Sequence, residues 1–481
     1  MNKSLANNIS WTFFSRFGAQ ATQLACSVFL ARMLTPTEYG IMGMLVVFSG
    51  FAQAIGDAGI NSAVIYSERN DTAFISTAFW IQTSINIALV ALFYFGAHYI
   101  ADFYSEPELY DISRVMSLNF VLLSMGQIQS SILAREMNFR AISIGNYLAA
   151  LISSIVALAM AYAGMGIWSL AAMTLTSSLV LLVFLSFSSR WLPSFQFERK
   201  AAAAIIRYGS YLLSNNSLNY WMRNGDNLAI GKFLGAVDLG VYNRAYTLML
   251  LPLQNIGAVL GQVMFAAMAR LKDDIPSLRA LYEKAIKQIA LIAFPAMAGL
   301  CILSNEVIAV LYGDQWSASA PLLRVLSLVG LLQCIVFPVG WIYSSLGHTR
   351  SQFRITLALF PIFLVTIGVG MLWGLIGVTV GYAVWAVISA VWNISVAGGL
   401  IGVGLWRYLF VLRKKVISTV AMAAVVVATV HFNEAPNSSL PQLMFQTAIG
   451  AAVYCLSCLI LRDDEFLELF GKLARKARLI S

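Results

Sequence analysis

Apolar stretches of about twenty residues follow one another along almost the whole chain, with little charge between them. Of 481 residues, 59% are hydrophobic and 11% are charged, whereas a soluble chain of this length carries about 25% charged residues. This composition provides too little polar surface to cover a water-soluble globule. We therefore expect an all-α integral membrane protein whose solvent is lipid.

The apolar stretches have the length that a membrane crossing requires. A bilayer core is about 30 Å thick, so a spanning helix needs about 20 apolar residues, and the chain divides into about 14 such segments. The predicted spans lie near residues 8–31, 38–66, 75–101, 113–134, 142–163, 165–189, 205–231, 238–268, 285–303, 318–345, 352–373, 376–400, 412–431 and 441–461.

Lysine and arginine indicate the orientation of these spans, because positively charged loops stay in the cytoplasm. With the N-terminus inside, most of the 31 Lys and Arg residues fall in predicted cytoplasmic segments, and the loops on the other side are short. An even number of spans then places the N- and C-termini in the cytoplasm. The formal net charge of +9 therefore reflects the basic residues that keep these segments in the cytoplasm, and it does not indicate a nucleic-acid partner.

Two stretches of sequence recur in the two halves of the chain. Residues 31–40 match residues 231–240, and residues 114–118 (RVMSL) reappear at 324–328 (RVLSL). Because six spans separate equivalent points, we expect two parallel six-helix lobes around a central cavity, as in an alternating-access transporter. The predicted parts are an N-lobe (1–190), a C-lobe (201–400), two C-terminal helices (401–462) and a cytoplasmic amphipathic tail (463–481).

Several motifs resemble those of a known family. They are residues 31–40 (ARMLTPTEYG), 57–60 (DAGI), 238–242 (DLGVY), 250–254 (LLPLQ), 311–316 (LYGDQW) and 321–324 (PLLR). In order and spacing they resemble the Wzx-type polysaccharide and O-antigen flippases of the multidrug/oligosaccharidyl-lipid/polysaccharide exporter (MOP) superfamily. The resemblance is closest to the colanic-acid-exporter-like branch.

This resemblance implies a function, a location and partners. It implies a flippase of the bacterial inner (plasma) membrane that moves an undecaprenyl-pyrophosphate-linked oligosaccharide from the cytoplasmic to the periplasmic face, for O-antigen, capsule or exopolysaccharide assembly. The partners would be the lipid-linked oligosaccharide and membrane lipid, with a polysaccharide polymerase and glycosyltransferases as further candidates. No cofactor is expected, and H⁺ or Na⁺ is the candidate coupling ion.

Three arginines inside predicted spans are candidates for binding an anionic pyrophosphate. An ionisable group within a span is costly, and guanidinium offers a planar fork of donors to phosphate oxygens. Arg16, Arg223 and Arg244 are therefore the predicted pyrophosphate ligands. The alternative for Arg16 and Arg244 is snorkelling toward the membrane surface.

Two aspartates are candidates for ion coupling. Asp226 lies three residues after Arg223, so the two side chains either form a structural pair or exchange partners during transport. Asp57 lies in the sequence Gly-Asp-Ala-Gly, where capping or bending of the helix is the alternative to ion coupling.

Polar and aromatic neighbours could contact the glycan, although hydrogen bonds between helices explain them equally well. These residues are Gln20, Gln23, Asn215, Asn216, Tyr220 and Trp221.

A small-molecule exporter and a membrane enzyme are the alternatives to a flippase. A multidrug or small-molecule exporter of the same superfamily is the main alternative, but three arginines against two aspartates in the spans favour an anionic cargo. A membrane enzyme such as a polymerase or ligase would need a sizeable outer loop with catalytic groups. The sequence offers no nucleophile–base constellation and no metal-ligand spacing.

Overall fold

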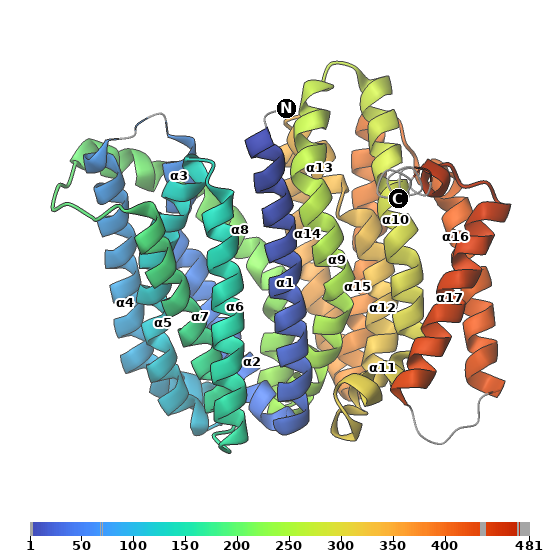
Figure 1. The fold of residues 1–481 in the computed structure, drawn as a ribbon, viewed down its shortest axis with the longest axis horizontal. Helices are drawn as coiled ribbons and strands as arrows, with labels where there is room; N and C mark the ends of the chain where they lie inside the picture. The colour runs from blue at the N-terminus through green and yellow to red at the C-terminus, as the bar shows by residue number, and fades with distance from the viewer. Residues whose placement is uncertain (1–2, 68, 70, 433–438, 469–470, 472–481) are drawn as a thin grey trace. The chain divides into compact units, whose positions relative to one another are not determined.

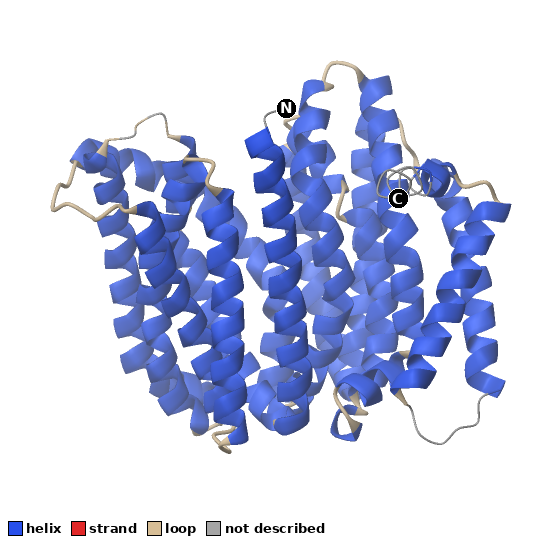
Figure 2. Cartoon of the chain, viewed as in Figure 1, coloured by secondary structure: helices blue, strands red, loops and turns tan. Residues whose placement is uncertain are grey.

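The computed structural model describes residues 3–67, 69, 71–432, 439–468 and 471. Within its helices, the side chains of residues 3–17, 66, 208–216, 254–263 and 265–266 lie outside the description. The described part is built from helices and the turns between them, without a β-strand (Figures 1 and 2). The expected all-α fold is therefore confirmed for that part.

The chain forms two compact units, Met1–Gly240 and Val241–Ser481, which we call unit 1 and unit 2. Unit 1 contains the first turn of α9 together with α1 (Lys3–Met33), α2 (Pro36–Asp57), α3 (Ile60–Tyr66), α4 (Thr72–Tyr104), α5 (Glu108–Arg135), α6 (Phe139–Tyr162), α7 (Trp168–Ser189) and α8 (Arg199–Phe233).

Unit 2 contains the rest of α9 (Ala236–Arg270), followed by α10 (Ile275–Ile302), α11 (Ser304–Leu311), η1 (Asp314–Trp316), α12 (Ser319–Val336), α13 (Val339–Ser345), α14 (Thr349–Gly370), η2 (Met371–Trp373), α15 (Gly374–Ile401), α16 (Leu405–Phe432) and α17 (Leu440–Ile460).

Each unit is a bundle of long helices joined by short turns (Figure 1). In unit 1, α4 packs along α5, α6 packs against α1 and α7, and α8 lies on α2. In unit 2, α10 packs against α12 and α16, α14 pairs with α15, and α16 pairs with α17. The predicted lobe boundaries near residues 190 and 201 remain a prediction.

Each predicted span coincides with at least one helix. Among the described residues, nine segments are long and apolar enough to cross a membrane, and one of them, Thr349–Ile401, contains both α14 and α15. Helices α1, α5, α8 and α9 are outside this set. α8 holds several charged side chains, Arg207, Arg223 and Asp226 among them. The protein is therefore an all-helical multi-pass membrane protein.

Glycine sets the packing of α14 on α15. A Cβ added at Gly377 would overlap the backbone carbonyl of Gly370, and one added at Gly381 would overlap that of Thr366. The two backbones therefore touch, as residues without a side chain permit.

Candidate functional site

A break in a helix creates the candidate site of unit 1. α2 ends at Asp57, and the next two residues adopt the left-handed conformation, with φ of 41° at Ala58 and 68° at Gly59. A left-handed residue ends an α-helix, and glycine, which stands at the second of the two positions, takes this conformation at no steric cost. The break occurs where the sequence predicted it.

The break places the Asp57 carboxylate beside a set of amide side chains. Asn61, the second residue of α3, donates a hydrogen bond to the Asp57 carboxylate and another to Oε1 of Gln127 on α5, at 3.1 Å. Gln82 on α4 donates from Nε2 to the same Gln127 oxygen at 2.6 Å. Ser131 donates from Oγ to Oδ1 of Asn61 at 3.0 Å. We call these five residues the Asp57 network.

The Asp57 network is anchored to helix backbone inside the bundle. Gln82 is fully buried, and Asn86, one turn further along α4, is 4% exposed. Asn86 donates from Nδ2 to the carbonyl oxygens of Gly56, at 3.2 Å, and Gln82, at 2.8 Å. Within the described part, Oε1 of Gln82 accepts no hydrogen bond. A buried oxygen without a donor is costly, so this atom can accept a proton donor or a cation.

Tyr220 and Trp221, the predicted glycan contacts of α8 whose side chains are described, face α2. The Tyr220 hydroxyl donates a hydrogen bond to the carbonyl oxygen of Val47 at 2.6 Å. The ring of Trp221 lies 5.0 Å from that of Phe51, between centroids. A Cβ added at Gly50 would stand 2.6 Å from the Tyr220 hydroxyl oxygen. Tyr220 and Trp221 therefore pack α8 onto α2, and a contact with glycan remains a prediction.

Arg223 and Asp226 have different surroundings although they share a helix. The Arg223 side chain is exposed, whereas Asp226 is 1% exposed. Oδ1 of Asp226 accepts a hydrogen bond from the backbone N–H of Asn227 at 2.8 Å. Both the structural and the functional interpretation of these two residues stay predictions.

Arg244 lies in unit 2 beside aromatic rings. Its guanidinium carbon is 5.7 Å from the ring centre of Tyr312 and 6.0 Å from that of Trp316. Both rings come from the LYGDQW motif, and the Trp316 side chain is fully buried. Cation–π contacts of this kind fix the position of a guanidinium without using its N–H groups.

The remaining predicted binding residues lie on α1 and α8. Gln20 is half-buried and Gln23 is exposed on α1. Arg16, Asn215 and Asn216 lie in helices, but their side chains are outside the described part of the chain.

Four members of the Asp57 network are absent from the residues predicted from the sequence. They are Asn61, Gln82, Gln127 and Ser131. A signal was available. Gln82 and Asn86 are four residues apart within one predicted span, and so are Gln127 and Ser131. Polar residues one helical turn apart within apolar segments indicate a shared polar face.

A comparison with protein families decides the identity. The profile of a family described as polysaccharide biosynthesis protein matches residues 29–321, more than half of the chain. The chain belongs to this family. This membership confirms the resemblance inferred from the sequence motifs, and the expectation of a transporter and not an enzyme agrees with a relative named for polysaccharide transport.

Three relatives match this chain at 25–26% identity. The teichuronic acid biosynthesis protein TuaB of Bacillus subtilis is 26% identical over 100% of this chain and 99% of its own length. The lipopolysaccharide biosynthesis protein WzxC of Escherichia coli is 26% identical over 75% of this chain and 74% of its own. The succinoglycan biosynthesis transport protein ExoT of Rhizobium meliloti is 25% identical over 95% and 93%.

Solved structures show the same fold. The lipid II flippase MurJ in an inward closed conformation aligns with 94% of this chain and 99% of its own, with a TM-score of 0.78 and 16% identity. An inward-facing multidrug resistance transporter of the MATE family aligns with 79% of this chain and 95% of its own, with a TM-score of 0.63 and 15% identity. The chain therefore has the fold of these two proteins.

Proposed function

We propose that this protein is a flippase that moves an undecaprenyl-pyrophosphate-linked oligosaccharide from the cytoplasmic to the periplasmic face of a bacterial inner membrane. The observation that carries the proposal is the full-length similarity to proteins named for the biosynthesis or transport of surface polysaccharides. The fold of a lipid II flippase supports it, because lipid II is itself a lipid-linked sugar.

The proposed mechanism is alternating access. Fourteen helices would cross the membrane, about 20 apolar residues each. Two six-helix lobes, residues 1–190 and 201–400, would open in turn to each face, and both termini would lie in the cytoplasm. The sequence repeat between residues 31–40 and 231–240 supports related lobes. A polysaccharide polymerase and glycosyltransferases would act before and after translocation.

The anionic headgroup would be held by arginines. The exposed guanidinium of Arg223 can approach a ligand, and the aromatic contacts of Arg244 position its guanidinium in advance. Pyrophosphate presents several oxygens to such planar donor groups, and each bond is charge-assisted. Arg16 is the third proposed ligand.

Asp57 is the better supported of the two coupling residues. Its carboxylate accepts a hydrogen bond from Asn61, and the amide of Asn61 reaches Gln127 and, through it, Gln82 on α4. A proton or Na⁺ at the Asp57 oxygen that accepts from Asn61 would compete with that hydrogen bond and weaken it. The amides of α3, α4 and α5 would then reorient. Charge at the break in α2 is thereby coupled to the packing of three further helices. Asp226 stays the second candidate.

The test is reconstitution of purified protein in liposomes with a lipid-linked oligosaccharide in one leaflet. We expect Asp57→Asn, which keeps the size and polarity of the side chain, to abolish the dependence of translocation on an H⁺ or Na⁺ gradient. The matched control Asp102→Asn changes an exposed acid of unit 1 and should keep that dependence. Unchanged gradient dependence in Asp57→Asn would exclude Asp57 as the coupling residue.

The same assay tests the anion site and the alternative function. Arg223→Ala should lose translocation, and the exposed control Arg350→Ala should retain it. If Arg223→Ala translocates normally, Arg223 is a structural residue. If folded wild-type protein moves cationic drugs but no lipid-linked oligosaccharide, the protein is a small-molecule exporter on the same scaffold.

A further inference from the structure

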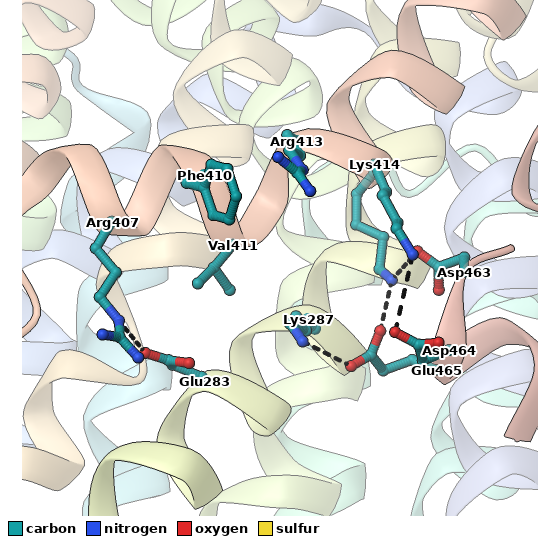
Figure 3. A pocket seen from close by; sticks show the side chains of 11 residues that line it. Glu283, Lys287, Arg407, Phe410, Val411, Arg413, Lys414, Asp463, Asp464 and Glu465 are labelled. Carbon is teal, nitrogen blue, oxygen red and sulfur yellow. Dashed lines mark hydrogen bonds and ion pairs between the residues drawn. The ribbon is translucent and has the colours of Figure 1, made fainter. Parts of the chain in front are cut away.

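A charged pocket of about 510 Å³ lies in unit 2, where α10, α16 and the segment after α17 meet (Figure 3). Its position is at one end of the apolar segments Leu405–Phe432 and Leu440–Ile460. The lining side chains are Glu283 and Lys287 from α10, Arg407, Phe410, Val411, Arg413, Lys414 and Lys415 from α16, and Asp463, Asp464 and Glu465 after α17.

One wall of the pocket is fixed by buried ion pairs. The side chains of Lys415 and Asp463 are 2% and 1% exposed and form an ion pair. Lys415 also contacts Glu465 at 2.9 Å, and Lys287 contacts the same carboxylate at 3.3 Å. Removing one charge from a buried pair is costly, so these contacts hold the segment after α17 against α10 and α16.

The remaining carboxylates of the pocket also have cationic partners. Glu283 accepts from Nε of Arg407 at 2.7 Å, and Asp464 lies 3.8 Å from Lys414. Figure 3 shows the Arg407–Glu283 pair on one side of the pocket and the cluster of lysines and carboxylates on the other. Among the described lining residues, five cations face four carboxylates, which leaves one positive charge over.

Arg413 carries that additional charge. Arg413 forms no ion pair with any residue in the described part of the chain. Its guanidinium carbon lies 3.8 Å from the ring centre of Phe410. A guanidinium stacked on an aromatic face keeps its N–H groups free in the plane, and their fork matches phosphate oxygens. The Arg413 side chain is exposed and therefore open to a ligand.

The pocket opens onto a surface suited to lipid. Trp406 is 84% exposed, Phe410 is 60% exposed and Leu409 is 53% exposed, all at the start of α16. Exposed aromatic and apolar side chains at the end of a membrane-spanning segment mark the layer between headgroups and hydrocarbon. Because Phe410 both lines the pocket and belongs to this surface, a ligand could fill the pocket from the lipid side.

We propose that this pocket binds the phosphate of an anionic phospholipid headgroup through Arg413. The acyl chains would lie along Phe410 and Leu409. Basic pockets between membrane helices are known to hold such headgroups. This site is separate from the one proposed for transported cargo and does not depend on what that cargo is.

The experiment uses purified full-length protein in neutral detergent, with phosphatidylglycerol and phosphatidylcholine of equal chain length as probes and native mass spectrometry as the readout. Wild type should prefer phosphatidylglycerol. Arg413→Gln should weaken phosphatidylglycerol binding about fivefold, which corresponds to about 1 kcal/mol for one basic residue at a membrane surface. Phosphatidylcholine binding should not change.

The matched control is Arg350→Gln, an exposed arginine at the start of α14 that lies outside the pocket. It should bind phosphatidylglycerol as wild type does. Equal affinity of wild type and Arg413→Gln, or an equal loss in Arg350→Gln, would overturn the proposal. A last experiment adds inorganic phosphate as a competitor of phosphatidylglycerol. If it competes with phosphatidylglycerol at equal concentration, the pocket is a site for a soluble anion and the lipid assignment is wrong.

Discussion

Gly40 and Gly240 occupy equivalent positions of the sequence repeat, and each lies against the helix that carries the other. A Cβ added at Gly40, on α2, would overlap the backbone carbonyl of Ala236 at the start of α9. A Cβ added at Gly240 would overlap the carbonyl of Pro36 at the start of α2 and stand 3.1 Å from the backbone nitrogen of Gly40. Such reciprocal contacts between equivalent residues are typical of two-fold related elements.

The reciprocal contact predicts that a methyl group at either glycine is not tolerated. Gly40→Ala and Gly240→Ala should each destabilise the protein by about 1–3 kcal/mol, because backbone atoms have to move apart. Thermal unfolding in detergent, followed by size-exclusion chromatography, measures the effect. Gly96→Ala is the matched control, since an added Cβ there meets open space within a helix, and it should be neutral or slightly stabilising. Equal melting temperatures for all three variants would show that the contact is not rigid.

The Asp57 network predicts that Asn61 stabilises the break after α2. Asn61→Leu removes hydrogen bonds to Asp57, Gln127 and Ser131, and we expect a loss of about 1–3 kcal/mol. Asn393→Leu is the control, because Asn393 bonds only to Ser389 of its own helix turn among the described contacts. Thermal unfolding of both variants checks the prediction, which fails if the two substitutions cost the same.

Replacing the buried Lys415 should destabilise the protein more than replacing Asn61 does. Lys415→Met leaves the carboxylates of Asp463 and Glu465 without their shared cation and should cost about 3–5 kcal/mol. Adding Asp463→Asn should recover part of that loss, since the buried charge is removed while the side chain can still cap the N–H of Phe466. The melting temperatures of the single and double variants measure this. A double variant no more stable than Lys415→Met would contradict the electrostatic explanation.

A surface ion pair predicts a dependence on pH. Arg69 contacts Asp71 at 2.8 Å and Glu198 at 2.6 Å, and its hydrogen bonds lower the pKa of both carboxyl groups. A lowered pKa in the folded state gives stability above the unfolded pKa, about 4 for these groups, and this stability is lost as the pH falls through the folded pKa. Arg69→Gln should therefore melt below wild type at pH 7, and the difference should shrink below pH of about 4. Arg350→Gln, measured in parallel, should show no such convergence with wild type.

The sequence predicted which segments are helices better than where the helices end. Hydropathy placed the tenth helix of the structure at 285–303, whereas α10 begins at Ile275, after the N-cap Asp274. The ten additional residues include the charged side chains of Arg279, Glu283 and Lys284, which lower the mean hydropathy of a window that covers them. An N-cap followed by proline was nevertheless a readable signal for the start of the helix. The span predicted at 318–345 is two helices, because Pro338 separates α12 from α13. Pro361 lies inside α14 without ending it, so the presence of a proline does not by itself predict where a helix ends.

The candidate site shows the same limit. The sequence identified Asp57 and the break that follows it, because glycine and aspartate in that order are local signals. It could not identify Gln82 and Gln127 as partners, because their meeting depends on how α4 and α5 are rotated about their axes. For Tyr220 the sequence suggested a contact with ligand, and in the structure its hydroxyl donates a hydrogen bond to the backbone of α2. The sequence could not predict this contact, because it depends on how α8 packs on α2.

Translocation itself is the most direct test of the central claim. Wild-type protein in liposomes, with an undecaprenyl-pyrophosphate-linked oligosaccharide confined to one leaflet, should make that oligosaccharide accessible to a sugar-modifying enzyme added on the opposite side. Protein-free liposomes should show no such access. We predict time-dependent exposure that increases with the amount of protein. Folded protein that exposes none of several lipid-linked glycans under H⁺ and Na⁺ gradients would contradict the account.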